Sequence, residues 1–308
     1  MIKILELFGG IGSPRIALRN LGIPTKAIDY VEIDQRAVDS YNEMFKNDLA
    51  YKTQSVVGYN LKPDILIHGS PCQDISIAGK KLGADKGSGT RSSLMWETIN
   101  IIEQMGEWKP EYVIWENVKG VLHKKMNGNF NQYLSEMERL GYTNNYEVLN
   151  AMDFGLPQNR ERVFTISHLG GEAFDFDNLE RKETDHISNY LQDDFEEEYI
   201  ITQPSMLSRI SSEADGFKGR LQEIKDYCWT ITTKQLRCPN SGIVPIGNGQ
   251  YRLLTPKECW LLQGYTEDDY ENASRVNGKT NLYKQAGNSI PVPIFESIFK
   301  EILKERIK

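Results

Sequence analysis

The sequence of 308 residues has little cysteine, no long hydrophobic run and no excess of positive charge. Its four cysteines (Cys72, Cys228, Cys238 and Cys259) show no Cys-x-x-Cys or Cys/His ligand spacing, which argues against a disulfide framework and a zinc site; we expect no metal. No apolar run approaches the roughly 18 residues of a membrane-spanning helix. The first residues lack the charged segment and cleavage pattern of a secretion signal. We therefore expect a cytoplasmic protein that does not enter a membrane.

Acidic residues outnumber basic ones, with 43 Asp and Glu against 36 Lys and Arg and a formal net charge of −7. This balance argues against a protein that coats nucleic acid or an anionic membrane non-specifically, but it leaves room for a local basic groove. Hydrophobic residues make up 39% and charged residues 26%, as in ordinary folded proteins. The length is sufficient for one large domain and a smaller one.

Short apolar runs alternate with helical patterns through the first 170 residues. The expected strands are Ile2–Phe8, Ala27–Ile33, Asp64–His68, Glu111–Trp115, Glu147–Ala151 and Val163–Ser167. The expected helices are Pro14–Leu21, Gln35–Phe45, Ser92–Met105 and Asn131–Leu140. This alternation predicts an α/β fold with a doubly wound, mainly parallel sheet that is covered on both faces. The last two strands are too close for a crossover helix, so we expect them to form an antiparallel pair at one edge.

The composition of the sequence changes between about residues 170 and 249, where charged, irregular stretches surround short segments such as Cys228–Thr233. Such a composition is typical of a loop-rich smaller domain. We expect a catalytic and cofactor-binding domain at residues 1–180, a recognition domain at 181–270, and a returning segment at 271–308 that ends in a helix, Pro291–Ile307.

A cysteine follows directly on the third expected strand, in the sequence Gly69–Gln73. A lone cysteine is more often a small buried side chain than a reactive one. Here Pro71 fixes the local backbone and polar residues follow, which favours a position at the lip of the sheet. A thiol needs a lowered pKa or nearby cations to act as a nucleophile. Arg160 and Arg162 are candidates for those cations.

Polar side chains also follow two later strands. Glu116 comes after Tyr112–Trp115, where burial of a carboxyl is costly unless it pairs or hydrogen-bonds. It is either a structural carboxylate or an acid that protonates a ring nitrogen. Arg160 and Arg162 are two residues apart and so share one face of a strand. They are either surface ion-pair residues or the lining of a shared pocket.

The first strand runs into Gly9, Gly10 and Gly12, and a helix opens at Ser13-Pro14. Such glycines allow a ligand to approach the backbone at a helix N-terminus, although ordinary tight turns use the same residues. Glu32 ends the second strand about twenty residues later, where doubly wound folds place a carboxylate for ribose hydroxyls. Because the spacing is not Gly-x-Gly-x-x-Gly, a nicotinamide cofactor is disfavoured.

The stretch from Gly79 to Ser93 contains four glycines and four basic residues without apolar periodicity. It is either a plain surface loop or a lid that closes over a polyanionic substrate beside Cys72. In the second case Lys80, Lys81, Lys86 and Arg91 would contact phosphates.

In order along the chain, these motifs resemble those of the DNA (cytosine-5)-methyltransferases that use S-adenosylmethionine. The resemblance covers nearly the whole chain and rests on the following segments: Phe8–Gly12, Glu32-Ile33, Pro71-Cys72-Gln73, Glu116-Asn117-Val118, Gln158-x-Arg160-x-Arg162, Arg252-x-Leu254-Thr255-Pro256-x-Glu258 and Gly287-Asn288-Ser289. Thr230-Ile231 is similar to a short element of the family's recognition domain. The resemblance implies a Rossmann-like methyltransferase fold with a smaller target recognition domain.

The resemblance also implies a role for each matching residue. The catalytic residues would be Cys72, Glu116, Arg160 and Arg162, with Cys72 adding to C6 of a flipped-out cytosine, Glu116 acting at N3 and Arg162 at O2. The cofactor-binding residues would be Phe8, Gly9, Gly10, Gly12, Glu32, Ile33, Pro71, Leu94, Asn288 and Ser289. The DNA-binding residues would be Ser76, Lys80, Lys81, Arg91, Thr230, Lys234 and Arg237.

Two departures bear on the adenine of the cofactor. Where the family usually carries an Asp that holds the adenine amino group, this chain reads Gln54-Ser55-Val56, and the adenine-stacking position is the aliphatic Ile33. The implied partner is double-stranded DNA, with a cognate restriction endonuclease in the same system as a further expectation, and a monomeric protein of bacterial or phage origin. The alternatives are the same chemistry on RNA, a catalytically silent DNA-binding regulator and, more distantly, a nicotinamide oxidoreductase.

Overall fold

The structure is a computed structural model, which describes residues 1–46, 48, 50–57, 61–70, 94–124, 126–210 and 221–306. A six-stranded sheet lies at its centre, with the strand order β2-β1-β3-β4-β7-β5. The strands are β1 (Ile2–Leu7), β2 (Thr25–Val31), β3 (Ile65–His68), β4 (Tyr112–Val118), β5 (Tyr142–Asn150) and β7 (Glu161–Leu169). Strands β2, β1, β3 and β4 are parallel, whereas β7 is antiparallel to both β4 and β5. The predicted mainly parallel sheet and its antiparallel edge pair are confirmed.

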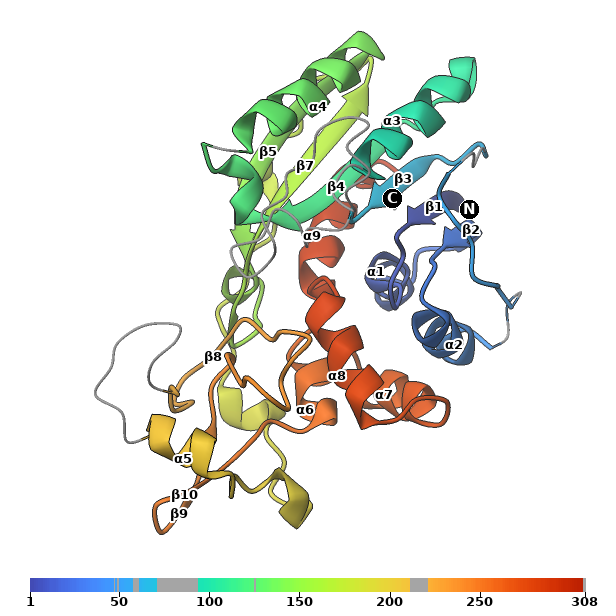
Figure 1. Cartoon of the computed structure of the whole chain (residues 1–308). Coiled ribbons are helices and arrows are strands. Elements are labelled where there is room, and N and C mark those ends of the chain that lie inside the picture. The colour runs from blue at the N-terminus through green and yellow to red at the C-terminus, as the bar shows by residue number, and fades with distance from the viewer. Residues whose placement is uncertain are drawn as a thin grey trace.

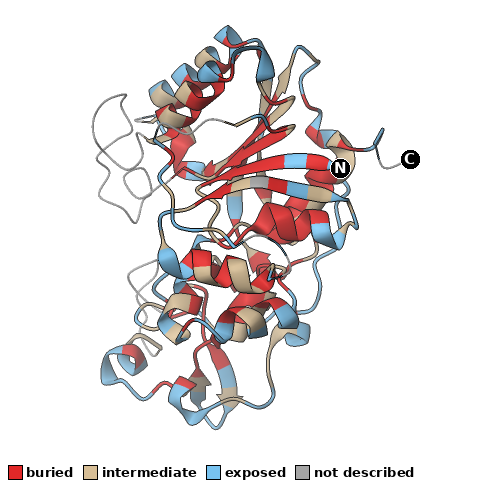
Figure 2. Ribbon diagram, turned by 90° about the vertical axis from the view of Figure 1, so that its right-hand side faces the viewer, coloured by how far each residue is buried: buried red, intermediate tan, exposed pale blue. Residues whose placement is uncertain are grey.

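Helices cover both faces of this sheet (Figure 1). They are α1 (Ser13–Asn20), α2 (Gln35–Met44), α3 (Met95–Gln104), α4 (Asn127–Arg139) and α9 (Val292–Ile302). Alternate strand residues divide between two clusters: Ile4 and Ile65 pack with α1 and α9, and Leu5 and Leu66 pack with α3 and α4. Figure 2 shows the strands and the inner helix faces as the buried part of the molecule. This two-sided burial is what the apolar runs of the sequence predicted.

The fourth strand differs from the prediction in a way that matters for the site. It was expected to end at Trp115, but β4 continues to Val118, so Glu116 lies within the strand rather than after it. The reason is its antiparallel neighbour: β7 pairs with β4 from Tyr112 through to Val118, which lies opposite Arg162. A ladder supplied by β7 holds polar residues in a strand that the apolar pattern alone ends too early.

Apart from β6, which directly precedes β7, the remaining elements follow β7 in the chain. Two short strands, β6 (Gln158–Asn159) and β8 (Cys228–Trp229), pair in parallel, and β9 (Val244–Gly247) and β10 (Gln250–Arg252) form a hairpin. The helices are α5 (Pro204–Ile210), α6 (Pro256–Leu261), α7 (Glu267–Ser274) and α8 (Lys279–Asn288). These elements were not predicted individually. The two-residue strands β6 and β8 leave no period in the sequence.

A small apolar cluster lies in this second part of the chain, built from Ile201, Met206, Leu221, Ile243 and Leu253. The large cluster beside the sheet also takes in α6, which the sequence analysis assigned to the recognition domain, through Cys259 and Trp260. Within the part of the chain that the structure describes, no helix is long and apolar enough to cross a membrane.

Candidate active site

A pocket opens at the carboxyl ends of the central strands, with about 430 Å³ of space that is partly open to solvent. Its walls come from β1 and the turn that follows it, the start of α1, the ends of β3 and β4, and the end of α8. The lining residues are Glu6, Leu7, Phe8, Gly9, Gly10, Ile11, Ser13, Pro14, Ile67, Gly69, Glu116, Asn288, Ser289 and Ile290. Six of the predicted site residues are thus brought together: Phe8, Gly9, Gly10, Glu116, Asn288 and Ser289.

The glycine turn is shaped by the aromatic rings beneath it. Gly12 adopts a φ of 76°, and a β-carbon there would lie 2.5 Å from the ring of Tyr41. A β-carbon on Gly9 would similarly collide with Tyr30, whose hydroxyl donates a hydrogen bond to the Gly10 carbonyl. Only glycine lets the backbone pass here, and Pro14 then sets the first turn of α1.

Glu32 fixes this turn from the neighbouring strand. Its carboxylate accepts hydrogen bonds from the backbone N–H groups of Gly10, Ile33 and Asp34 at 2.8–2.9 Å. A carboxylate has about four acceptor positions, so the three backbone donors leave room for a ligand hydroxyl. Ile33 is 77% exposed beside it and presents an apolar surface to solvent. Four of the predicted cofactor residues do not line the pocket themselves: Gly12, Glu32, Ile33 and Leu94. Leu94 occupies the N-cap position of α3.

The carboxyl of Glu116 forms an ion pair with Arg162 across the β4–β7 ladder, with 3.2 Å between Arg162 Nε and Glu116 Oε1. Burial raises the pKa of Glu116 above its ordinary value, although the positive charges of Arg162 and Arg160 oppose the rise. A carboxyl in this environment holds its proton more tightly than one in water, as a general acid must.

The two predicted arginines have different surroundings. Arg162 contacts Glu116, whereas the buried guanidinium of Arg160 donates to the carbonyls of Ile231, Gly287 and Ser289 at 2.9, 3.1 and 2.7 Å. Arg160 lies between β6 and β7 rather than in the strand that holds Arg162, and it connects this point of the chain to the segment after β8 and to the end of α8.

Several predicted residues lie outside the described ranges: Pro71, Cys72, Ser76, Lys80, Lys81, Lys86 and Arg91. Ser70 is the last described residue before them, and Leu94 is the first described residue after them. The Ser70 hydroxyl accepts a hydrogen bond from Trp115 Nε1 at 3.0 Å, and its carbonyl accepts one from Asn117 Nδ2 at 3.2 Å. The residue two positions before Cys72 is thus fixed to the strand that carries Glu116.

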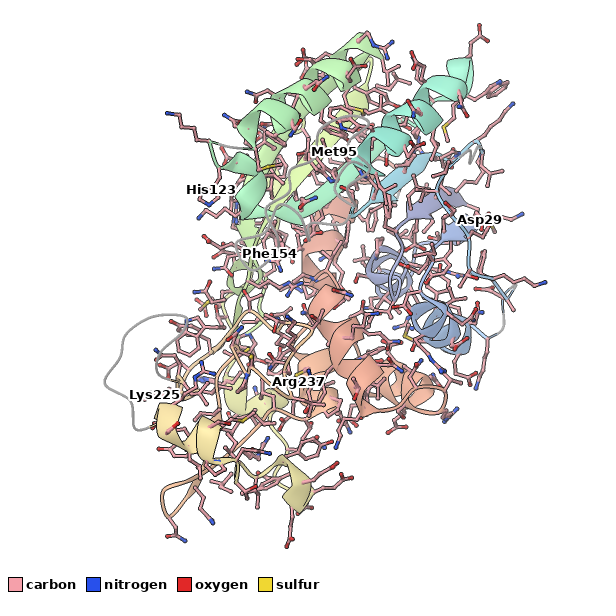
Figure 3. The ribbon with its side chains drawn as sticks, in the orientation of Figure 1. Asp29, Met95, His123, Phe154, Lys225 and Arg237 are labelled. Carbon is pink, nitrogen blue, oxygen red and sulfur yellow. The ribbon has the colours of Figure 1, made fainter. Side chains whose placement is uncertain are left out.

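The predicted DNA contacts of the second part of the chain are only partly free to bind. Thr230 uses its hydroxyl in a 2.9 Å hydrogen bond to the Asn159 carbonyl. Lys234 and Arg237 are exposed on the turn that follows. Figure 3 shows Arg237 and Lys225 in the lower half of the view, below Phe154.

Glu6, an acidic residue in the middle of the apolar first strand, was not predicted as a site residue. Its carboxyl is buried at one wall of the pocket and accepts a 2.7 Å hydrogen bond from the Tyr41 hydroxyl. Tyr41 in turn accepts a hydrogen bond from Arg15, which pairs with Asp48. Burial raises the pKa of Glu6 to about 7, against the lowering effects of Tyr41 and Arg15. An isolated charge in an apolar run was the available signal.

A glycine turn and a buried acid lie around one pocket at the carboxyl ends of a mainly parallel sheet, which is where α/β enzymes of this type bind their ligands.

The comparisons with known proteins specify the class further. The family model described as C-5 cytosine-specific DNA methylase matches residues 2–304. The type II methyltransferase M2.ScrFI of Lactococcus lactis subsp. cremoris is 33% identical over 99% of this chain and its own full length. M.Bsp6I of Bacillus sp. (strain RFL6), also a type II methyltransferase, is 30% identical over the whole of both chains.

Solved structures agree on the fold. The Dnmt2 methyltransferase of S. pombe superposes with a TM-score of 0.79 at 19% identity, covering 99% of both chains. The Entamoeba histolytica methyltransferase EhMeth gives the same TM-score and coverage at 17% identity.

The chain belongs to the C-5 cytosine-specific DNA methylase family. It is a DNA (cytosine-5-)-methyltransferase, as the sequence motifs predicted, rather than a nicotinamide oxidoreductase or a silent regulator.

Proposed function

We propose that this enzyme transfers a methyl group from S-adenosylmethionine to C5 of a flipped-out cytosine in a specific duplex DNA sequence, through a covalent adduct between Cys72 and C6. The observation that carries the proposal is the pocket in which the glycine turn, Glu116 and the Asn288-Ser289 turn meet. Arg162 pairs with Glu116 at its edge, and Ser70, two positions before Cys72 in the sequence, accepts a hydrogen bond from Asn117.

The residues present fit S-adenosylmethionine. The turn residues Phe8, Gly9 and Gly10 line the space together with Asn288 and Ser289. The remaining acceptor position of Glu32 suits a ribose hydroxyl, and exposed Ile33 suits the face of adenine. When bound, this cofactor supplies an electrophilic methyl group. We propose that Gly12, Pro71 and Leu94 support the same site, as the family motifs imply.

The chain's own residues would then perform the chemistry. The Cys72 thiolate adds to C6, and the electron pair of the C5–C6 double bond becomes available at C5, while Glu116 donates a proton to N3. C5 would form a bond to the methyl group, and the pair of the broken carbon–sulfur bond would stay with the cofactor, which becomes S-adenosylhomocysteine. The proton on C5 would then pass to solvent, its electron pair would restore the double bond as the C6–sulfur bond breaks, and Cys72 would leave as the thiolate. N3 would return its proton to Glu116. Covalent catalysis of this kind divides one high barrier into two lower ones.

Two features support the assigned roles of the charged residues. The pKa of Glu116 is raised by burial, so its carboxyl is suited to donate a proton. Arg162 contacts Oε1 of Glu116 and so fixes the orientation of that carboxyl while its guanidinium holds the O2 of the base. Arg160 was assigned to the catalytic group as well; its three carbonyl partners support a positioning role in that group.

Double-stranded DNA is the proposed substrate, with base flipping at a cost of a few kcal/mol. Residues 181–270 would form the recognition domain, with Thr230, Lys234 and Arg237 near the target, and Ser76, Lys80, Lys81 and Arg91 would contact the backbone beside the flipped base. We further propose a monomer in the cytoplasm, accompanied by a cognate restriction endonuclease, since two of its relatives are named type II methyltransferases.

The test compares two variants, in each of which one cysteine is replaced by alanine. Bisulfite sequencing of DNA from cells that express the parental chain should show protection at one short sequence, which identifies the target. Cys72→Ala should abolish methyl transfer at that site while S-adenosylhomocysteine binding, measured by calorimetry, persists. Cys238→Ala, which changes a half-buried free cysteine in the second part of the chain, is the matched control and should retain activity. Methyl transfer by Cys72→Ala at a near-parental rate would remove Cys72 as the nucleophile.

A further inference from the structure

Three segments that are distant in the sequence meet at the guanidinium of Arg160. Its Nη1 donates to the Ile231 carbonyl, and its Nη2 donates to the carbonyls of Gly287 and Ser289. The side chain is only 2% exposed. Ile231 follows the proposed DNA contact Thr230, and Ser289 lines the pocket. The buried guanidinium of Arg160 thus joins the proposed DNA-contacting segment, residues 228–237, to the cofactor pocket.

Gln158 holds the same segment from the opposite side. Its side-chain oxygen accepts the Ile231 N–H at 3.0 Å, and its side-chain nitrogen donates to the Leu262 carbonyl at 2.8 Å. The Thr230 hydroxyl donates to the Asn159 carbonyl, beside it in the chain. Residues 230 and 231 are therefore held by their backbone and side-chain polar groups, and their position follows that of the groups that hold them.

Direct packing reinforces the hydrogen bonds. A β-carbon on Gly287 would collide with backbone atoms of Thr232 and Thr233. Gly287 belongs to the last turn of α8, in which an alanine would normally be more favourable than glycine. A close approach between two backbones, rather than backbone conformation, explains the glycine.

We infer that Arg160 and Gly287 are positioning residues that couple cofactor binding to the DNA-contacting segment at residues 228–237, an inference that rests on the proposed function. A ligand at Asn288 and Ser289 orders the end of α8, and through Arg160 and the Gly287 contact it orders the segment after β8. DNA bound there then meets a surface that is already ordered and loses less conformational entropy. Linkage requires that DNA strengthen cofactor binding by the same factor.

The structure provides a matched pair of variants. Gly287→Ala introduces one methyl group against the backbone of residues 232 and 233, while Gly128→Ala makes the same change within helix α4, where nothing lies within 4 Å. Arg160→Lys keeps the positive charge but loses the planar fork that reaches three carbonyls. None of these changes touches Glu116 or Arg162.

The experiment is hydrogen exchange of peptides spanning residues 228–240, with and without saturating S-adenosylhomocysteine and no DNA. We expect the ligand to slow exchange severalfold in the parental protein and in Gly128→Ala, and to lose this effect in Gly287→Ala and Arg160→Lys. An unchanged exchange rate in the parental protein would overturn the inference, as would a parental response in Gly287→Ala. If Arg160→Lys does not fold, the two glycine variants decide.

A second readout is the factor by which duplex DNA, carrying the site found by bisulfite sequencing, strengthens S-adenosylhomocysteine binding. Coupling factors of about 5- to 150-fold are typical. We expect the parental protein to show a factor in this range, and Gly287→Ala to show almost no strengthening. A purely structural role would lower the melting temperature and leave this ratio in place, which would contradict the inference. Failure of the cofactor assignment, on which the inference rests, is distinguishable, because the parental protein would then not bind S-adenosylhomocysteine at all. Failure of the Cys72 assignment is read separately, from the activity of Cys72→Ala.

Discussion

Two buried carboxylate–guanidinium pairs lie in different regions of the molecule, and only one of them faces the pocket. Arg252 and Glu258 form an almost completely buried bidentate ion pair. Arg252 Nη2 donates to Glu258 Oε1 at 2.7 Å, and Nη1 donates to Oε2 at 2.8 Å. The Glu258 oxygens also accept the backbone N–H groups of Gln192 and Thr255. The Glu116–Arg162 pair has a single 3.2 Å contact, and both side chains retain 12–14% exposure.

The difference separates a structural pair from a chemical one. Glu258 closes the capping box of α6 and fixes the chain between two segments, so its acceptors are used by the fold. Glu116 keeps a looser partner, borders an open pocket and has a raised pKa. A carboxyl available for proton transfer has to keep part of its bonding capacity for the substrate.

The largest expected effect is on catalysis at the pocket. Glu116→Gln keeps the shape of the side chain but removes the proton donor, and we expect kcat to fall by about 10²- to 10⁴-fold. The unfolding free energy should fall only slightly, because Arg162, which loses its charged partner, makes a single 3.2 Å contact and is partly exposed to solvent. Steady-state kinetics and urea denaturation check both halves; near-parental kcat would show that Glu116 is not the acid.

The structural pair should give the opposite result. Glu258→Gln leaves Arg252 buried without a charged partner, for which a loss of about 3–5 kcal/mol of unfolding free energy is typical. The kcat of the folded fraction should change little, since Glu258 does not line the pocket. Urea denaturation measures the loss, and the control is Lys119→Ala, which breaks an exposed ion pair with Glu161. Equal stability of the two variants would contradict the distinction.

A third buried carboxyl, Glu6, sharpens the comparison through pH. Its pKa is about 7 in the folded protein, against an ordinary value of 4.5, with Tyr41 from α2 and Arg15 from α1 facing it. The folded protein therefore holds a proton that the unfolded chain releases between these values. Its contribution to stability is present below pH 4.5 and is lost as the pH rises to 7, by about 3 kcal/mol.

The measurement is urea denaturation of the parental protein and of Glu6→Gln at several pH values from 4.5 to 7.5. The stability of the parental protein should decrease relative to that of Glu6→Gln as the pH rises, with most of the change below pH 7. A difference that is independent of pH would mean that Glu6 does not change its pKa on folding.

These pairs also show where sequence interpretation succeeded. Period and spacing predicted the sheet and its antiparallel edge, and they placed Gly9 and Glu116 at strand ends that meet at one edge. Asn288 and Ser289, which also line the pocket, were predicted only through the family resemblance. The extension of β4 to Val118 depends on the β7 ladder, which no local pattern records. The partners of Arg160 come from residues 231, 287 and 289, and their meeting is a result of tertiary packing.

Covalent trapping tests the central claim most directly. A duplex whose cytosines are all replaced by 5-fluorocytosine is incubated with the parental enzyme and S-adenosylmethionine. Because fluorine cannot leave C5 as a proton does, we expect an adduct that survives denaturation and maps to Cys72. An enzyme preparation that methylates ordinary DNA and yet forms no such adduct would contradict the account.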